Sequence, residues 1–302
     1  MKLQQVFDFL AVTQHGSVHA AARATGQTQP AMTKSLRRLE RTLGLPLFER
    51  HAKGMRPNDF GMRFLPHAQH LVHEAKRARE AMSQMRGERM GSVSYGISPA
   101  AAALLAPPAL QRFRLMYPEV QLDTCSGGYA TLAPQLRDGE LDFAICPLPP
   151  GQTDPQLQMR ELMNGPMVML ARQDHPLRKT QSLEDLRDVV FAVVGPPGQP
   201  GAAVYDVFED AGLGTPRVDM QADSPSDAAA LVAESDRMAL LPAVVLATAA
   251  PHQRLAVVPI TDPLPNFLIG LFHRASGALT PAAQALATQF EHEAAFLRCT
   301  PS

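Results

Sequence analysis

The sequence predicts an N-terminal all-α winged helix-turn-helix with a long linker helix, followed by a two-lobed α/β region. The chain has 302 residues, about twice a common domain size. Its charge is divided, because residues 1–90 carry 15 Lys and Arg against 7 Asp and Glu, whereas residues 91–302 carry 13 against 22. Beyond Gly91, apolar residues change from helical spacing to short runs that alternate with helical stretches.

Composition and cysteine usage exclude several classes of protein. A chain with 45% hydrophobic and 19% charged residues is ordinary for a globular protein. Cys125, Cys146 and Cys299 lie far apart without a CxxC pair, which predicts neither a disulfide framework nor a zinc finger. The N-terminus makes a poor signal peptide, and no apolar run approaches about 18 residues. We therefore expect a cytoplasmic protein with no membrane partner.

Two short helices are expected within the first 26 residues. The first ends near His15 and Gly16, Ser17 can cap the second, and Gly26 permits a tight turn after it. Small alanines in the second helix allow another helix to cross it closely. The buried stripe of the first helix consists of Leu3, Val6, Phe7, Leu10 and Ala11.

The third helix has the pattern of a recognition helix. Thr28 is its expected N-cap, Pro30 lies in its first turn, and Gly44 ends it. A major groove accepts one helix, whose first turns reach base edges. Gln29 and Thr33 are therefore the predicted base readers, with Lys34 beside them and the arginines farther along reaching phosphates. The buried side is Met32, Leu36, Leu39 and Leu43, and the outward side is Thr33, Lys34, Arg37, Arg38 and Arg41.

A wing of two short strands around a turn at Gly54 is expected next, completing a winged helix-turn-helix within residues 1–58. Its Arg50, Lys53 and Arg56 would meet the DNA backbone or the minor groove. Each piece alone, such as a basic helix face, is more often a solvated surface or a packing choice. The residues assigned to DNA binding are Ser17, Gln29, Pro30, Thr33, Lys34, Arg37, Arg38, Arg50 and Lys53.

The combined pattern from Phe9 to Arg50 resembles the LysR-type transcriptional regulators over its whole length. It departs at Thr33, where the family usually has serine, and at Pro57-Asn58, where the family usually has Leu-Thr. The hydroxyl is retained at Thr33, and Asn58 can still cap the next helix. The matching positions are Phe9, Ser17, Ala20 to Ala22, Gln29-Pro30-Ala31, Leu36, Leu39-Glu40, Leu43-Gly44, Pro46-Leu47-Phe48 and Arg50.

Residues 59–90 predict a dimerising linker helix, because their apolar residues recur close to every 3.5 positions. Pro66 should bend the helix without abolishing it. Pairing of two linkers would place two recognition helices on successive major grooves of a pseudo-palindromic operator. His67, His70, His73 and Glu74 are taken as a solvated helix face rather than a metal site. The seam consists of Phe60, Phe64, Ala68, Leu71, Ala75, Ala78, Met82 and Met85.

Residues 91–302 predict eight strands, mainly parallel, in two lobes. The chain would cross between the lobes near Met163-Asn164-Gly165 and again near Pro265-Asn266. Lobe I would then contain residues 91–163 and 267–302, and lobe II residues 164–266. The expected strands are Val93 to Ile97, Val120 to Cys125, Leu141 to Ile145, Met167 to Ala171, Val189 to Val194, Met238 to Leu241, Leu255 to Val258 and Phe267 to Phe272.

This region resembles the LysR effector-binding domain through residues 136–145, 174–177 and 240–242. The resemblance implies the two-lobed fold of type 2 periplasmic solute-binding proteins. Residues 234–237 depart from the family's usual glycine-rich turn, so the resemblance does not define the cleft wall of lobe II at these positions. Segments 129–144 and 232–236 resemble the subgroup around toluenesulfonate-type regulators.

Loops that follow strands in both lobes predict an effector cleft, because loop N–H groups and helix N-termini attract anions. Any single such loop is more often simply a turn. The loops contain no Lys or Arg, so a small organic or aromatic acid held by neutral donors is expected. The residues assigned to the effector are Ser98, Pro99, Ala100, Gly127, Gly128, Tyr129, Gly195, Pro196 and Ser224.

These features predict a DNA-binding transcription regulator without a cofactor or metal. We expect it to be associated with the nucleoid, dimerised through its linker and assembled as a homotetramer, with RNA polymerase as a candidate partner. An enzyme is the main alternative, but no G-x-S-x-G elbow, H-E-x-x-H helix or cysteine motif is present. A sensor whose N-terminal domain binds only proteins would leave the basic helix face without a purpose.

Overall fold

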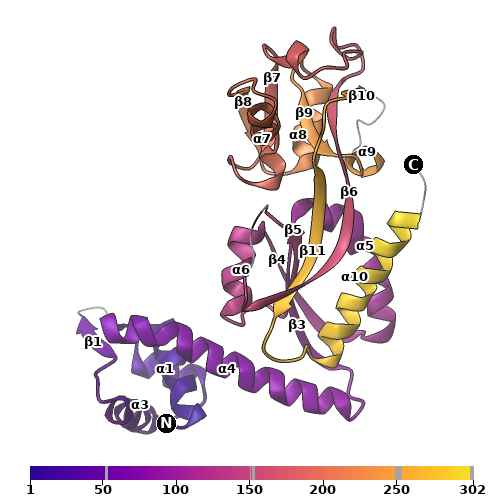
Figure 1. Cartoon of the computed structure of the whole chain (residues 1–302). Helices are drawn as coiled ribbons and strands as arrows, with labels where there is room; N and C mark the ends of the chain where they lie inside the picture. Colours follow the sequence, from indigo (N-terminus) through magenta and orange to yellow (C-terminus); the bar gives the residue numbers. More distant parts are fainter. Residues whose placement is uncertain (52–53, 150, 152–153, 249–253, 300–302) are drawn as a thin grey trace. The chain divides into compact units, whose positions relative to one another are not determined.

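The computed structural model describes the chain except for residues 52–53, 150, 152–153, 249–253 and 300–302 (Figure 1). Its residues separate into two compact units, which are mainly residues 1–88 and residues 89–302. Within the described residues, no helix is both long enough and apolar enough to cross a bilayer.

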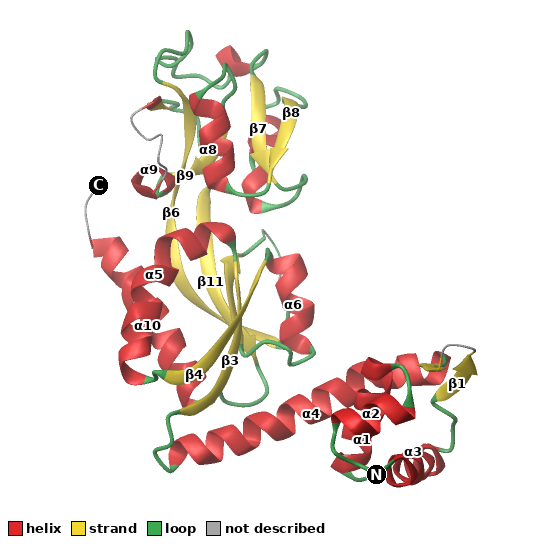
Figure 2. Cartoon of the chain, turned by 180° about the vertical axis from the view of Figure 1, so that it is seen from behind, coloured by secondary structure: helices red, strands yellow, loops and turns green. Residues whose placement is uncertain are grey.

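The N-terminal unit is a winged helix-turn-helix followed by one long helix (Figures 1 and 2). The expected caps are present, since the Ser17 Oγ accepts from the Ala20 N–H at 3.0 Å and the Thr28 Oγ1 accepts from the Ala31 N–H at 3.4 Å. Gly44 ends the third helix in the left-handed conformation. The elements are α1 (Leu3–His15), α2 (Val18–Ala24), α3 (Gln29–Leu43), β1 (Phe48–His51), β2 (Gly54–Pro57) and α4 (Asp59–Met85).

The core of this unit centres on Phe9 of α1, which is fully buried. Its ring lies 5.2 Å from that of Phe48 on β1 and 5.1 Å from that of Phe64 on α4. One aromatic residue therefore joins the first helix, the wing and the linker helix. Around it pack the buried residues Val6, Val12, Ala21, Ala22, Met32, Leu36, Leu39, Leu47 and Ala68.

The predicted dimer seam divides into two parts. Phe64 and Ala68 face the core of their own unit and are not available to a partner. Leu71, Met82 and Met85 remain 39%, 56% and 72% exposed. Phe60, the first residue of the predicted seam, is 45% exposed. The seam prediction was therefore wrong at Phe64 and Ala68, which complete the helix-turn-helix core. Pro66 lies within α4 without interrupting it.

The wing is held against the turn between α1 and α2. The Met55 N–H donates to the Gly16 carbonyl at 2.7 Å. At Gly54 φ is +132°, and an added Cβ would lie 2.3 Å from the Gly16 oxygen. Only glycine fits this close approach.

Gly54→Ala is expected to destabilise the N-terminal unit by about 1 kcal/mol or more, because it combines backbone strain with the clash against Gly16. Urea unfolding followed by circular dichroism would measure the loss. Gly26→Ala is the matched control, since it has positive φ but nothing within 4 Å of an added Cβ. Equal losses for the two variants would contradict the packing argument.

The second unit consists of two α/β lobes (Figure 2). In lobe I, α5 and α10 cover one face of the sheet, and α6 covers the other. The elements are β3 (Met90–Ile97), α5 (Pro99–Met116), β4 (Glu119–Ser126), α6 (Tyr129–Arg137), β5 (Phe143–Pro147), β6 (Leu157–Arg172), η1 (Glu184–Leu186), β7 (Val190–Val194), η2 (Pro200–Ala202), α7 (Val204–Asp210), β8 (Arg217–Ala222), α8 (Pro225–Ala233), β9 (Ala239–Pro242), α9 (Val245–Thr248), β10 (Leu255–Val258), β11 (Asn266–Arg274) and α10 (Pro281–Cys299).

Strand pairing in this unit is mixed, so the expectation of mainly parallel strands was wrong. β3 lies parallel to β4 and β5, and β7 lies parallel to β8. β11 is antiparallel to β5 and β6, and β6 is antiparallel to β9 and β10. The reason is that β6 and β11 run through both lobes in opposite directions. The expectation for β6 covered only its apolar second half, and β8 was missed because polar residues alternate along it.

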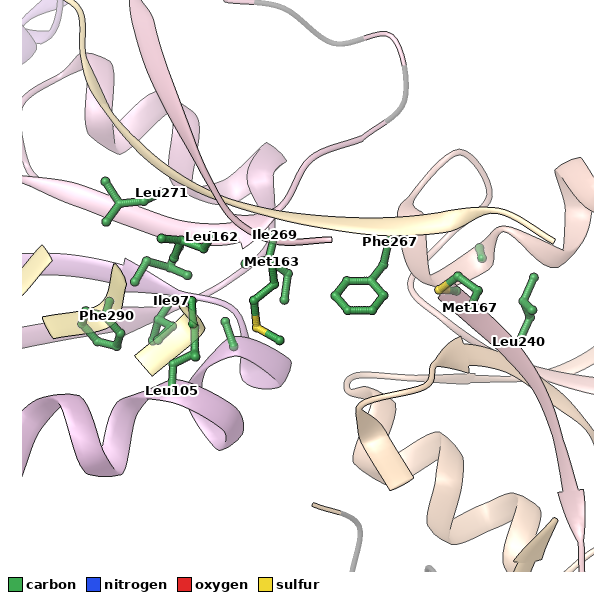
Figure 3. Close-up of a cluster of buried hydrophobic side chains, with 14 of the residues drawn as sticks. Ile97, Leu105, Leu162, Met163, Met167, Leu240, Phe267, Ile269, Leu271 and Phe290 are labelled. Atoms are coloured by element: carbon green, nitrogen blue, oxygen red, sulfur yellow. The ribbon is translucent and has the colours of Figure 1, made fainter. Parts of the chain in front are cut away.

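The two crossing strands form the connection between the lobes. Their register pairs Met163 with Ile269 and Gly165 with Phe267. Gly165 is needed because an added Cβ would lie 2.9 Å from the Phe267 ring. Figure 3 shows this ring between Met163 on one side and Met167 with Leu240 on the other. Phe267 therefore joins the cores of the two lobes.

Candidate nucleic-acid interface and ligand cleft

One face of α3 is buried and the opposite face is polar and basic. Met32, Leu36 and Leu39 point into the core, and Leu39 is fully buried. This packing fixes the helix rotation, so its other face lies on the surface of the unit. That face borders a surface groove lined by Gln29, Pro30, Thr33, Lys34, Arg37, Arg38 and Arg41.

The cations of this face are not neutralised by any acidic side chain that the structure describes. Among the residues that the structure describes, Lys34, Arg37, Arg38 and Arg41 have no acidic partner within salt-bridge distance. The one acid of α3, Glu40, accepts instead from the Leu47 N–H at 2.8 Å. The positive charge is therefore available for an external anion such as phosphate.

The two predicted base readers differ in their local bonds. The Thr33 hydroxyl donates to the Gln29 carbonyl at 2.8 Å, so its proton is committed to the helix and only its lone pairs remain to accept. The Gln29 side chain is exposed and has no hydrogen bond to another described residue. Gln29 thus keeps both a donor and an acceptor for a base edge.

Three other residues, Ser17, Arg50 and Lys53, are also predicted to contact DNA. Ser17 uses its hydroxyl oxygen to cap α2. The Arg50 side chain and Lys53 lie outside the described residues. Their contacts with DNA therefore stay predictions.

A buried carboxylate that sequence reasoning missed positions α3. Asp8 is 1% exposed, and its Oδ1 accepts from the Gln27 side chain at 2.7 Å and from the Gln4 side chain at 3.0 Å. Gln27 lies in the turn just before α3, so Asp8 links α1 to the start of this helix. A polar residue within an apolar helical stripe was the only available signal.

The second unit contains a cleft of about 500 Å³ between its lobes. Seven residues assigned to the effector line it: Ser98, Pro99, Ala100, Gly128, Tyr129, Gly195 and Pro196. The assignment also included Gly127 and Ser224, which do not line the cleft. The Gly127 N–H donates to the Ile97 carbonyl at 3.2 Å, and the Ser224 Oγ accepts from the Asp227 N–H at 3.2 Å. Both residues therefore stabilise loops whose neighbouring residues line the cleft.

The cleft wall is mostly apolar, and helix N-termini face it from both lobes. In lobe I, α5 and α6 begin at the cleft, and the Ser98 hydroxyl caps α5. In lobe II, α8 begins at Pro225. Tyr129 is 9% exposed, and its ring packs edge-on against Phe272 with centroids 5.1 Å apart, so this residue presents little surface to the cleft.

Several residues of the wall were not predicted. Gln221 and Asp223 lie at the carboxyl end of β8, and they were missed because that strand was missed. The alternation of polar and apolar residues in β8 is the signal that could have found them. The other unpredicted residues are Ala130, Thr131, Pro147, Met167, Val194, Gln199, Pro200, Gly201, Ala222, Pro225, Leu241, Pro242, Phe267 and Ile269.

Residues 234–237 do not line the cleft, contrary to expectation. They follow the C-terminus of α8, whereas the cleft is at its N-terminus. Three ion pairs hold this turn. Arg172 contacts Asp236 at 2.7 Å, and Arg237 contacts Asp219 at 2.6 Å. Arg254 contacts Glu234. The hydrogen bond from Arg172 lowers the pKa of Asp236 below its usual value. Charge pairing replaces the glycine-rich turn here.

A winged helix-turn-helix with an unneutralised basic face, in one chain with a two-lobed cleft, defines a DNA-binding transcription regulator that has an effector-binding domain. The lysR-family model of bacterial regulatory helix-turn-helix proteins matches residues 3–62, and the LysR substrate binding domain model matches residues 86–295. The chain belongs to the LysR family of transcription regulators and is not an enzyme.

Similar proteins share this organisation. The SDS degradation transcriptional activation protein of a Pseudomonas strain is 30% identical over 290 residues, covering 94% of each chain. The regulator GalR of Pseudomonas putida is 31% identical over 284 residues, covering 93% of this chain and 71% of its own. The crystal structure of full-length CbnR with its target DNA has a TM-score of 0.65 at 22% identity, covering 97% of this chain and 100% of the other. A full-length OxyR variant from Pseudomonas aeruginosa has a TM-score of 0.68 at 22% identity, covering 97% and 94%.

Proposed function

We propose that this regulator binds a pseudo-palindromic operator through Gln29, Thr33 and Lys34 of α3, with the arginines of α3 on phosphates. The observation that carries this proposal is the row of exposed α3 cations without acidic partners among the described residues. Ser17, Pro30, Arg50 and Lys53 complete the proposed contact surface. Binding to an operator would associate the protein with the nucleoid, and a promoter-bound oligomer would act through RNA polymerase.

The oligomer is proposed to begin as a dimer through the exposed part of α4. Leu71, Met82 and Met85 recur at steps compatible with a helix seam and are all exposed. Exposed apolar residues in such a row are better explained by a partner helix than by contact with water. Two such dimers would make the proposed homotetramer.

The effector is proposed to be an organic acid with an apolar body. The wall of the cleft supports this, because it is largely apolar and receives the N-termini of α5 and α6. The name of the Pseudomonas relative makes alkyl sulfates candidates for this acid, and the toluenesulfonate-type resemblance makes aromatic sulfonates candidates. Closure of the lobes on the acid would change how the effector domains pack within the oligomer. Typical coupling of this kind is about 1–3 kcal/mol.

Operator selection tests the DNA-binding proposal. The full-length protein should enrich a duplex with two related half-sites from a random-sequence pool. Its affinity for that duplex should fall with salt by about 0.9 log unit per log unit for each phosphate neutralised. Failure to enrich any duplex, or a flat salt response, would overturn the proposal. Arg37→Ala should reduce the salt slope, whereas Arg187→Ala, at an exposed position in the second unit, should leave it unchanged.

A further inference from the structure

We infer that the ligand cleft is electrically polarised and selects an acid that also carries a hydrogen-bond donor, which Asp223 accepts. This inference rests on the proposed effector function and narrows the class of effector. The acid group would lie against lobe I, and a hydroxyl or amino group at the other end of the ligand would lie against lobe II. A plain organic acid lacks the second group.

Lobe I supplies the positive wall. The helices α5 and α6 both begin at the cleft, and neither has an acidic residue in its first turn. The partial positive charge at each helix start is therefore not offset by the helix's own side chains. Pro99 supplies no N–H at the start of α5. The Ala101 and Ala102 N–H groups already donate to Ser98, so the Ala100 N–H is the donor that this turn offers to a ligand.

Lobe II supplies the negative wall. Asp223 is exposed and is the only residue with a formal charge among the described residues that line the cleft. It comes directly before Ser224, the N-cap of α8, and Asp227 lies in the first turn of the same helix. Two carboxylates thus offset the positive end of α8, which makes lobe II the wrong wall for an anion.

The Asp223 carboxylate is available to a ligand. It has no hydrogen bond or ion pair with any other residue that the structure describes. Gln221 and Gln199 lie in the same wall, and their amides can complete the contacts of a hydroxyl or an ammonium group. Asp227 differs, because its carboxylate contacts the Ser224 hydroxyl at 2.7 Å and does not line the cleft.

Matched acids test this inference by thermal shift of the full-length protein. The probes are benzoate, para-hydroxybenzoate, para-aminobenzoate and terephthalate, with butanoate to octanoate and their omega-hydroxy and dicarboxylate counterparts. Within one size, the hydroxy or amino acid should bind about tenfold more tightly than the unsubstituted acid, because a hydrogen bond to a charged acceptor is strong. The dicarboxylate should bind most weakly, since its second charge meets Asp223.

Two variants separate a direct contact from a general charge effect. Asp223→Asn should remove the tenfold preference and weaken the exclusion of dicarboxylates. Asp227→Asn should keep both, although it changes the charge near the same helix end. A preference that survives Asp223→Asn, or unsubstituted acids and dicarboxylates that bind as tightly as donor-bearing acids, would overturn the inference. The inference would also be overturned if no acid raised the Tm. Operator selection tests DNA binding independently of any acid, so failure of this inference can be distinguished from failure of the proposed regulator function.

Discussion

Gln29→Ala is expected to lower affinity for the selected operator by up to about 3 kcal/mol while leaving affinity for random duplex DNA nearly unchanged. The reason is that Gln29 stands at the first position of α3 with a free amide group, and an amide can bond an adenine edge through two hydrogen bonds. Because the side chain is exposed, its removal should not disturb the core. Competition binding with operator and random duplexes would measure both affinities.

Arg41→Ala is the matched control for Gln29→Ala. Arg41 borders the same groove but lies in the last turn of α3, where phosphate contact is expected. Arg41→Ala should lower the affinities for operator and random duplex DNA by similar factors. Equal losses on the two duplexes for Gln29→Ala would contradict its assignment as a base reader.

Gly128→Phe is expected to abolish the response to effector while leaving operator binding intact. Gly128 lines the cleft, and an added Cβ there would meet nothing within 4 Å. Its φ lies outside the left-handed region, so a side chain adds no backbone strain. The ring would occupy space that the ligand needs. Thermal shift with the best acid, together with operator binding at saturating acid, would report the loss.

Gln121→Phe tests whether any added ring has the same effect. Gln121 is exposed on β4 and does not line the cleft. Its response to the acid should match that of the unaltered protein. If Gly128→Phe retained the response to the acid, the effector site would lie outside this cleft.

The sequence predicted the DNA-binding elements well because their signals are local. A hydroxyl cap, a proline in the first turn and a final glycine mark the ends of α3 within its own residues. The burial of Met32, Leu36 and Leu39 follows from helical spacing, and the outward position of the basic residues follows from the same spacing.

The cleft was predicted less completely because its wall combines loops that are distant in the sequence. Ser98, Gly128 and Gly195 were found because each follows one of the predicted strands. Asp223 was not predicted, because β8, the strand before it, has exposed polar residues at alternate positions and was itself not predicted. Phe267 and Met167 looked like ordinary strand residues, and only the crossing of β6 with β11 brings them to the cleft.

The sequence by itself determined the winged helix-turn-helix, its basic α3 face and the two-part division of the chain, because helical period, caps and charge act over a few residues. Only the tertiary structure decided that Phe64 and Ala68 serve the core rather than a dimer seam, that residues 234–237 stand away from the cleft, and that Asp223 stands in it. These outcomes depend on which surfaces meet, and contacts between distant segments leave no periodic trace in either segment alone.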